Sequence, residues 1–150
     1  MRAIQCAVLM ALILVPGWLT DSWGAPQHAP QTANKQAQID RGRYLVEEVA
    51  RCPECHTPRD SKGNLEEDKW LQGATIWIMP VHPTQNWAER VPPLAGLPSY
   101  SDEQAERVLE EGTGPDGRAL QPPMHTYHLK HEDAVAIIAY LRSLPPGQPQ

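Results

Sequence analysis

The chain has 150 residues, of which 41% are hydrophobic and 21% are charged, and this length is typical of one domain. The hydrophobic content excludes a fully disordered chain, and the net charge of −5 argues against a nucleic-acid-binding protein, because contacts to phosphate need a basic surface. The 16 prolines and the absence of phenylalanine predict long loops around a small core, which needs a cofactor or a covalent link for stability.

The first 24 residues have the pattern of a secretory signal peptide. Arg2 precedes an unbroken apolar run from Cys6 to Val15. Small residues at Ser22 and Gly24 fit a cleavage site before Ala25. The run is too short for a bilayer span, which needs about 20 residues, so we expect no transmembrane segment in the mature chain. An uncleaved N-terminal anchor is the alternative, and the expected location is the periplasm.

The mature chain is expected to begin with a flexible leader. Residues 25–35 are polar and lack periodicity, as in segments that do not fold. From Gln36 to Arg51 the apolar residues recur at helical spacing, and Pro53 is expected to end this helix. We therefore place a single domain over residues 36–146 and a short tail over residues 147–150.

Loops are expected after the first helix. Residues 57–99 contain six prolines, and Thr75–Met79 fits a short strand for which no partner is evident. The next predicted helix extends from Ser101 to Glu111. Its first residue forms a capping box with Gln104, and Gly112 ends it.

A third helix is expected from His131 to Leu144. Its sequence is apolar almost all round, which predicts the most buried element of the fold. These elements indicate an all-α fold of three or more helices, in which so much loop is typical of a functional or cofactor-built interior.

The sequence Cys52-Pro53-Glu54-Cys55-His56 has the C-x-x-C-H pattern to which c-type haem is attached. Two thiols at this spacing reach the two vinyl groups of one porphyrin and form thioethers, and the histidine that follows is held under the iron. Without the signal peptide, Cys52 and Cys55 are the only cysteines of the chain. We therefore expect one covalently attached haem c, with His56 as an iron ligand.

Three other uses of a Cys-x-x-Cys pair fit the sequence less well. A thioredoxin-like motif needs a βαβ context, whereas a helix followed by a loop is predicted here. A structural zinc site needs four ligands, and although His125, His128 and His131 are candidates, export and the adjacent His56 favour haem. A disulfide across two residues would be strained and would leave His56 without a role.

A family resemblance is carried by five segments: RGRYLV (41–46), CPECHTP (52–58), PPLAG (92–96), PPM (122–124) together with Tyr127, and AYLRSLP (139–145). The first two are similar to a branch of bacterial cytochromes whose members are often associated with dehydrogenases. The third is similar to the loop after the haem histidine, the fourth to the loop of the methionine ligand, and the fifth to the terminal helix. Over residues 39–146 the chain therefore resembles class I c-type cytochromes that carry one haem.

The resemblance implies the class I cytochrome c fold, in which the N- and C-terminal helices cross closely and long loops surround the haem. Gly42 then lies at the crossing, where a residue without a side chain permits close approach, and Tyr140 packs nearby. The resemblance also implies Met124 as the second iron ligand. It further implies that the carbonyl of Pro92 accepts a hydrogen bond from His56.

The residues alone leave other candidates for the second ligand. Met79 also precedes a proline, although its apolar neighbours at 76–78 suggest ordinary packing. His125, which stands where the family has a proline, or His128 would give a bis-histidine iron, and the site could also be open. The candidates for shielding the haem or for a hydrogen bond to a haem propionate are Trp70, Trp77 and Trp87.

The resemblance implies a periplasmic electron-transfer protein whose haem iron cycles between Fe(II) and Fe(III), with no catalytic residues of its own. Its expected partners are redox proteins, with a dehydrogenase as donor and an oxidase or another cytochrome as acceptor. One alternative is an electron-accepting haem c subunit of a membrane or periplasmic dehydrogenase complex. The other is a ligand-binding or peroxidase-like haem protein with an open iron site.

Overall fold

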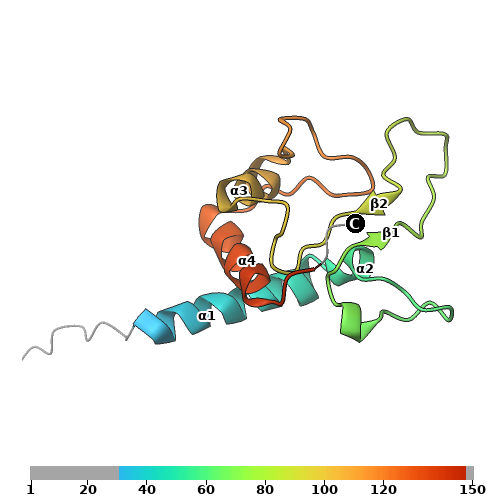
Figure 1. Ribbon diagram of the computed structural model, residues 1–150. Coiled ribbons are helices and arrows are strands. Elements are labelled where there is room, and N and C mark those ends of the chain that lie inside the picture. Colours follow the sequence, from blue (N-terminus) through green and yellow to red (C-terminus); the bar gives the residue numbers. More distant parts are fainter. Residues whose placement is uncertain (1–30, 148–150) are drawn as a thin grey trace, which may run out of the picture.

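The computed structural model describes residues 31–147, and the three longer helices lie together on one side of it, with the long loops on the other (Figure 1). This arrangement confirms the predicted all-α fold class. None of the helices in this part of the chain is long and apolar enough to cross a membrane. The elements are α1 (Gln31–Tyr44), the π-helical turn η1 (Leu45–Val49), α2 (Pro53–His56), the 3-10 turn η2 (Glu67–Lys69), β1 (Ala74–Thr75), β2 (Arg90–Val91), α3 (Asp102–Glu111) and α4 (His131–Ser143).

Helices α1 and α4 cross at Gly42, as the resemblance to class I cytochromes implies. A Cβ atom on Gly42 would lie 1.9 Å from the carbonyl oxygen of Ala136 and 2.8 Å from the Cβ atom of Tyr140. Only glycine fits there, so this residue sets the distance between the two helices. The hydroxyl of the buried Tyr140 donates a hydrogen bond to the carboxylate of Glu47, which ties α4 to the turn that leads to α2.

The core lies between these helices and the loop that follows β2. Arg142 of α4 fixes this loop, because its guanidinium donates hydrogen bonds of 2.7 Å to the carbonyl oxygens of Gly96 and Tyr100. The N–H of Gly96 in turn donates to the carbonyl of Leu141 at 2.8 Å. The largest hydrophobic side chains of the core are Leu45, Val46, Leu71, Leu97, Ile137, Ile138, Tyr140 and Leu141.

Helices α3 and α4 agree closely with the prediction. The hydroxyl of Ser101 accepts a hydrogen bond from the N–H of Gln104 at 3.2 Å, and the side-chain oxygen of Gln104 accepts one from the N–H of Ser101 at 2.9 Å. Gly112 ends α3 in the left-handed conformation, with φ of 69°. Helix α4 begins at His131 and is the most buried of the three longer helices, so the local signals sufficed for both elements.

Helix α1 differs from the prediction at both ends. It begins at Gln31, so residues 31–35, predicted to be part of a flexible leader, are helical. Their sequence contains good helix formers, and a polar composition fits an exposed helix as well as it fits a leader. At the other end helical structure stops at Val49, and Arg51 has a left-handed φ of 55°. Pro53 therefore begins α2 instead of ending the first helix.

Of the strand expected over Thr75–Met79, only Thr75 is in a strand, because β1 consists of Ala74 and Thr75, and this strand has a partner. Strand β1 pairs antiparallel with β2, with Ala74 opposite Val91 and Thr75 opposite Arg90. The partner lies beyond a long loop, and a pairing between residues so far apart leaves no local signal in the sequence. This loop, residues 76–89, extends away from the helices (Figure 1).

The ends of the domain are only partly described. The predicted signal peptide, its cleavage site and the first residues of the leader lie outside the described residues, as do residues 148–150. Gly147, assigned to the tail from the sequence, is buried, and its N–H donates a hydrogen bond of 2.9 Å to the carbonyl of Ala95. The fold therefore includes this residue.

Candidate functional site

The Cys-x-x-Cys-His motif forms α2, a single helical turn that starts directly after Cys52. The N–H of His56 donates a hydrogen bond of 2.9 Å to the carbonyl of Cys52, which is the bond of an α-helix. Residues at positions i, i+3 and i+4 share one face of a helix. Cys52, Cys55 and His56 therefore lie on the same side of the turn.

The two ring nitrogens of His56 have different partners. Nδ1 lies 2.9 Å from the carbonyl oxygen of Pro92, and because a carbonyl can only accept, Nδ1 carries the hydrogen and donates it. Nε2 is buried and has no hydrogen-bond partner within residues 31–147. Burial lowers the pKa of His56, against the opposing effect of the bond to Pro92. The ring is therefore neutral, with its lone pair on Nε2, which is the form that ligates a metal.

The thiols of the motif stay protonated. Burial raises the pKa of Cys52 to about 11, and burial together with the nearby carboxylate of Glu54 raises the pKa of Cys55. A redox-active dithiol needs a cysteine with a lowered pKa. The surroundings of this pair therefore argue against the thioredoxin-like alternative.

His56 and Cys52 line a mainly apolar cavity of about 740 Å³. Ligand sites in proteins commonly measure about 300–1,000 Å³. Helix α3 contributes three apolar residues of one face, Ala105, Val108 and Leu109, to the wall. Further wall residues come from α4, from the loop after β2 and from the loop between α3 and α4. Elements from most of the described chain therefore meet around one interior space.

Met124 lies in the wall of the same cavity. Its loop is held by hydrogen bonds to other segments on both sides of Met124. The N–H of Ala88 donates a hydrogen bond of 2.8 Å to the carbonyl of Pro122, and the hydroxyl of Tyr127 donates one of 3.3 Å to the carbonyl of Ala50. Burial raises the pKa of Tyr127 to about 12, so this hydroxyl keeps its proton. The loop thereby places Met124 in the same space as His56.

The other candidates for the second iron ligand lie elsewhere. Met79 is 82% exposed and is not part of the cavity wall. His125 and His128 are exposed and are also outside the wall. His131 forms an ion pair with Glu110, with 2.9 Å between Nδ1 and Oε1. Among the described residues, the geometry thus favours Met124 over each of these alternatives.

Taken together, the residues present fit a c-type haem. An unpaired, buried imidazole nitrogen belongs to the wall of an apolar cavity, and a thioether side chain lies in the same wall. Cys52 is in the wall, and Cys55, which is not, occupies the same helical turn. Two thiols for covalent attachment, and an imidazole and a thioether as iron ligands, are the groups that such a site needs.

Comparison with known proteins identifies the family. The family described as cytochrome c matches residues 39–145. The chain belongs to the cytochrome c family. This cytochrome thus has haem c as the cofactor of its family, and the resemblance found in its sequence is confirmed.

Its relatives include subunits of dehydrogenases. The cytochrome subunit of a fructose dehydrogenase from Gluconobacter japonicus is 36% identical over 113 residues, which cover 71% of this chain and 22% of the relative. A dihaem c-type cytochrome from Cereibacter sphaeroides is 30% identical over 136 residues, 87% of this chain and 40% of the relative. The cytochrome c subunit of a quinone alcohol dehydrogenase from Gluconacetobacter polyoxogenes is 30% identical over 136 residues, 83% of this chain and 28% of the relative. The cytochrome therefore spans less than half the length of each of these relatives.

Some residues of the site have no role in the sequence-based prediction. The tyrosine rings in the cavity wall belong to Tyr100 and Tyr127, whereas the three tryptophans, all within the described chain, lie outside the wall. Tyr127 belongs with the PPM segment to the resemblance to the loop of the methionine ligand, whereas nothing in the sequence marks Tyr100. Arg142 lies in the terminal helix segment, and its bonds to backbone carbonyls become evident only in the fold.

Proposed function

We propose that this cytochrome is a periplasmic electron-transfer protein that carries one haem c. The supporting observation is the buried Nε2 atom of His56, which has no hydrogen-bond partner within the described chain and belongs to a neutral ring. A buried polar atom left unpaired costs about 1–3 kcal/mol, and a bond to iron would offset that cost. Bound haem supplies a one-electron couple between Fe(II) and Fe(III).

Each residue of the proposed site has a separate task. Cys52 and Cys55 hold the haem through thioether bonds, and His56 ligates the iron through Nε2. The carbonyl of Pro92 orients the imidazole and keeps its hydrogen on Nδ1. Met124 supplies the second ligand from the loop after α3. Ligation by methionine and histidine raises the reduction potential, which suits an acceptor of electrons from a dehydrogenase.

We assign no catalytic acid, base or nucleophile to this chain, which exchanges electrons only with other proteins. The proposed donor is a dehydrogenase and the proposed acceptor is an oxidase or another cytochrome. A second candidate function is that of an electron-accepting subunit within a dehydrogenase complex. The names of two relatives, cytochrome subunits of a fructose dehydrogenase and of an alcohol dehydrogenase, favour it. Stable co-purification with a dehydrogenase would distinguish a subunit from a free carrier.

Absorption spectra of the oxidised and the reduced holoprotein test the proposed function. We expect a c-type spectrum, one iron per chain and haem that stays with the protein during extraction by acid–acetone. The reduced protein should not bind carbon monoxide, because Met124 occupies the second axial position. His56→Ala should lose the native spectrum, whereas His82→Ala, in an exposed loop, should keep it. Release of haem into the organic phase, or two titratable thiols, would contradict the proposal.

A further inference from the structure

The loop between α3 and α4, which carries Met124, packs directly against the residue that ends α3 (Figure 1). A Cβ atom on Gly112 would lie 2.2 Å from Cγ2 of Thr126 and 3.2 Å from its Cβ. Carbon atoms in ordinary contact are about 3.5–4.0 Å apart, so Thr126 occupies the space that a side chain at position 112 would need. Because Thr126 is two residues beyond Met124, the contact lies next to the proposed second iron ligand in the chain.

Gly112 meets two separate structural requirements. It ends α3 in the left-handed conformation, and its N–H donates a hydrogen bond to the carbonyl of Arg107. This conformation alone does not demand glycine, because asparagine also occurs at such helix ends. The contact with Thr126 does demand it, since every other residue has a Cβ atom. The close approach is therefore a feature that the termination of the helix does not explain.

The end of α3 also holds this loop through hydrogen bonds on both sides of Met124. The N–H of Leu120 donates a bond of 3.2 Å to the carbonyl of Gly112, and the N–H of Leu129 donates one of 3.2 Å to the carbonyl of Leu109. The last four carbonyls of a helix have no partner within it, so they can accept bonds from a neighbouring segment. The loop therefore takes its position from the end of α3.

Of the two segments in contact, the loop is the one that can move. Ala105 and Leu109 fix α3 in the hydrophobic core, whereas Thr126 is exposed. Threonine is restricted about χ1, so rotation of its side chain does not readily free the space. Ordinary contact with a new Cβ atom thus needs a movement of the loop by about 1 Å or more. The groups of a functional site must be held within about 0.5 Å, so such a movement would misplace Met124.

We propose that Gly112 is a positioning residue for the second iron ligand, because its close contact with Thr126 sets the place from which Met124 binds the haem iron. The inference rests on the proposed function, in which Met124 is that ligand. Gly112 does not belong to the cavity wall, so it acts only through the loop.

Gly117 provides a matched control in the same loop. It also has a left-handed φ, of 75°, but a Cβ atom on it would meet no atom within 4 Å. Gly112→Ala and Gly117→Ala therefore introduce comparable backbone strain, and only Gly112→Ala adds a clash with Thr126. A role of Gly112 that was limited to its backbone conformation would give the two variants the same properties.

The test compares these variants as holoproteins. Gly112→Ala should keep covalent haem, because α2 is unchanged, but should lose at least half of the weak near-red absorption of ferric iron bound to a methionine sulfur. Its reduced form should bind carbon monoxide. Gly117→Ala should keep the full band and bind no carbon monoxide. The double variant Gly112→Ala/Thr126→Ala lacks Cγ2 of residue 126, so it should recover the band of the parent.

Gly112→Asn separates the contact from the helix end in a second way. Asparagine adopts the left-handed conformation more readily than alanine does, but it has a Cβ atom. Gly112→Asn should therefore lose the near-red band as Gly112→Ala does, and Thr126→Ala should restore it. If Gly112→Ala yields no holoprotein, Gly112→Asn with and without Thr126→Ala provides the same comparison.

Several results would overturn the positioning role of Gly112. These are a full near-red band in Gly112→Ala or Gly112→Asn, an equal loss in Gly117→Ala, and a loss that Thr126→Ala does not reverse. Failure of every Gly112 variant to yield holoprotein, the double variants included, would also overturn it, because relief of the contact would then have no effect. If the parent itself shows no near-red band, the proposed ligation by Met124 fails instead.

Discussion

The orientation of His56 depends on a backbone atom. Its Nδ1 donates to the carbonyl of Pro92, so the acceptor remains whatever side chain is present at position 92. What residue 92 controls is the path of the backbone, which proline restricts through its fixed φ. The sequence indicates this contact only through the resemblance to class I cytochromes, because the two residues are separated by a long loop and no local pattern connects them.

At the same scale, we predict that the spectrum depends on Met124 and not on Met79. Met124→Ala should retain covalent haem, because the residues of α2 are unchanged. It should lose the weak near-red absorption of ferric iron bound to a methionine sulfur, and its reduced form should bind carbon monoxide. Met124→His should lower the reduction potential markedly, because thioether sulfur stabilises Fe(II) and the axial ligand is among the strongest influences on the potential.

Met79→Ala is the matched control for this prediction. Met79 is 82% exposed and outside the cavity wall, so its removal should leave the near-red band and the potential unchanged. If the band survives Met124→Ala and disappears in Met79→Ala, the assignment is reversed. If the parent never shows the band, a histidine such as His125 or His128 becomes the leading candidate.

A second prediction at this scale concerns Gly42. Helix propensity alone predicts that Gly42→Ala stabilises the protein by about 1 kcal/mol. The new Cβ atom would lie 1.9 Å from the carbonyl oxygen of Ala136, however, so α1 and α4 must separate. Because overpacking typically costs about 1–3 kcal/mol, we expect the free energy of unfolding to fall by about 2 kcal/mol or more.

Chemical denaturation of the holoprotein measures this effect. Gly63→Ala serves as the control, because a Cβ atom on Gly63 would meet no atom within 4 Å. Residue 63 has a φ of 88°, so backbone strain alone should lower the stability of this variant by about 1 kcal/mol. A Gly42→Ala variant that is as stable as the parent would show that the helices do not need close contact at this point.

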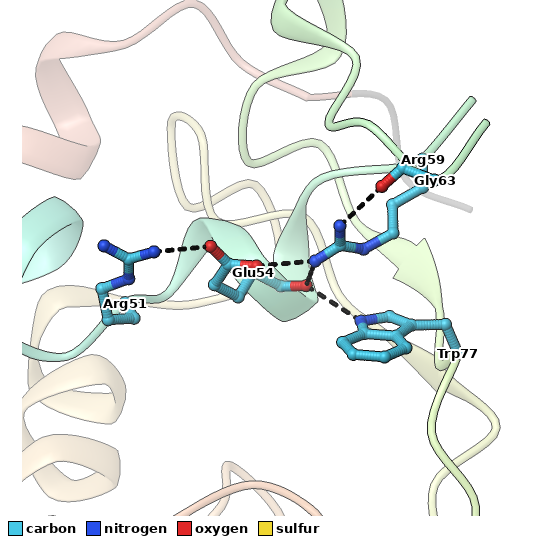
Figure 2. A network of polar contacts seen from close by, with 5 residues as sticks. All are labelled: Arg51, Glu54, Arg59, Gly63 and Trp77. Atoms are coloured by element: carbon cyan, nitrogen blue, oxygen red, sulfur yellow. Dashed lines mark hydrogen bonds and ion pairs between the residues drawn. The ribbon is translucent and has the colours of Figure 1, made fainter.

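At the scale of elements, local signals predict structure better than distant pairings do. The capping box of Ser101 and Gln104 lies within four residues, and α3 begins and ends where the sequence indicates. Strand β1 depends on a partner beyond a long loop, so its pairing is not evident from the sequence. The interpretation of residues 76–78 as ordinary packing is wrong for Trp77, which is 59% exposed. The position of its side chain depends on contacts with distant residues, such as the hydrogen bond to the carbonyl of Glu54 (Figure 2), and no local pattern indicates them.

The contact between α3 and α4 should depend on pH. The hydrogen bond to Glu110, and more weakly the charges of Glu110, Glu106 and Glu132, raise the pKa of His131 above its ordinary value of 6.5. A raised pKa in the folded state stabilises the fold fully at pH values below 6.5, and this contribution is lost as the pH rises through the folded pKa. We therefore expect His131→Gln to destabilise the holoprotein at pH 5.5 and to have little effect at pH 9.

Thermal unfolding of the parent and His131→Gln across this pH range provides the measurement. Glu110→Gln removes the main partner of His131, so in that background His131→Gln should have a smaller effect at low pH. A destabilisation by His131→Gln that is equal at all pH values would show that the histidine acts through packing or helix propensity and not through its charge.

At the scale of the whole molecule, the site divides into a part that sequence predicts and a part that requires the fold. The C-x-x-C-H motif is one helical turn, so its residue types and spacing are sufficient to predict the attachment of haem. The cavity is built from segments far apart in the chain, and the place of Met124 in its wall depends on how two loops are fixed to each other.

The final prediction is that this fold depends on covalent haem. Without haem, the mainly apolar walls of the cavity of about 740 Å³ would have no group to pack against, and such a loss of packing destabilises a fold whose total stability is usually only about 5–15 kcal/mol. The Cys52→Ser/Cys55→Ser double variant should therefore show no cooperative thermal transition by circular dichroism and should be cleaved rapidly by trypsin. Cys6→Ser, the same substitution within the predicted signal peptide, should yield a mature holoprotein like the parent. A haem-free double variant that melts cooperatively near the temperature of the holoprotein would contradict this dependence.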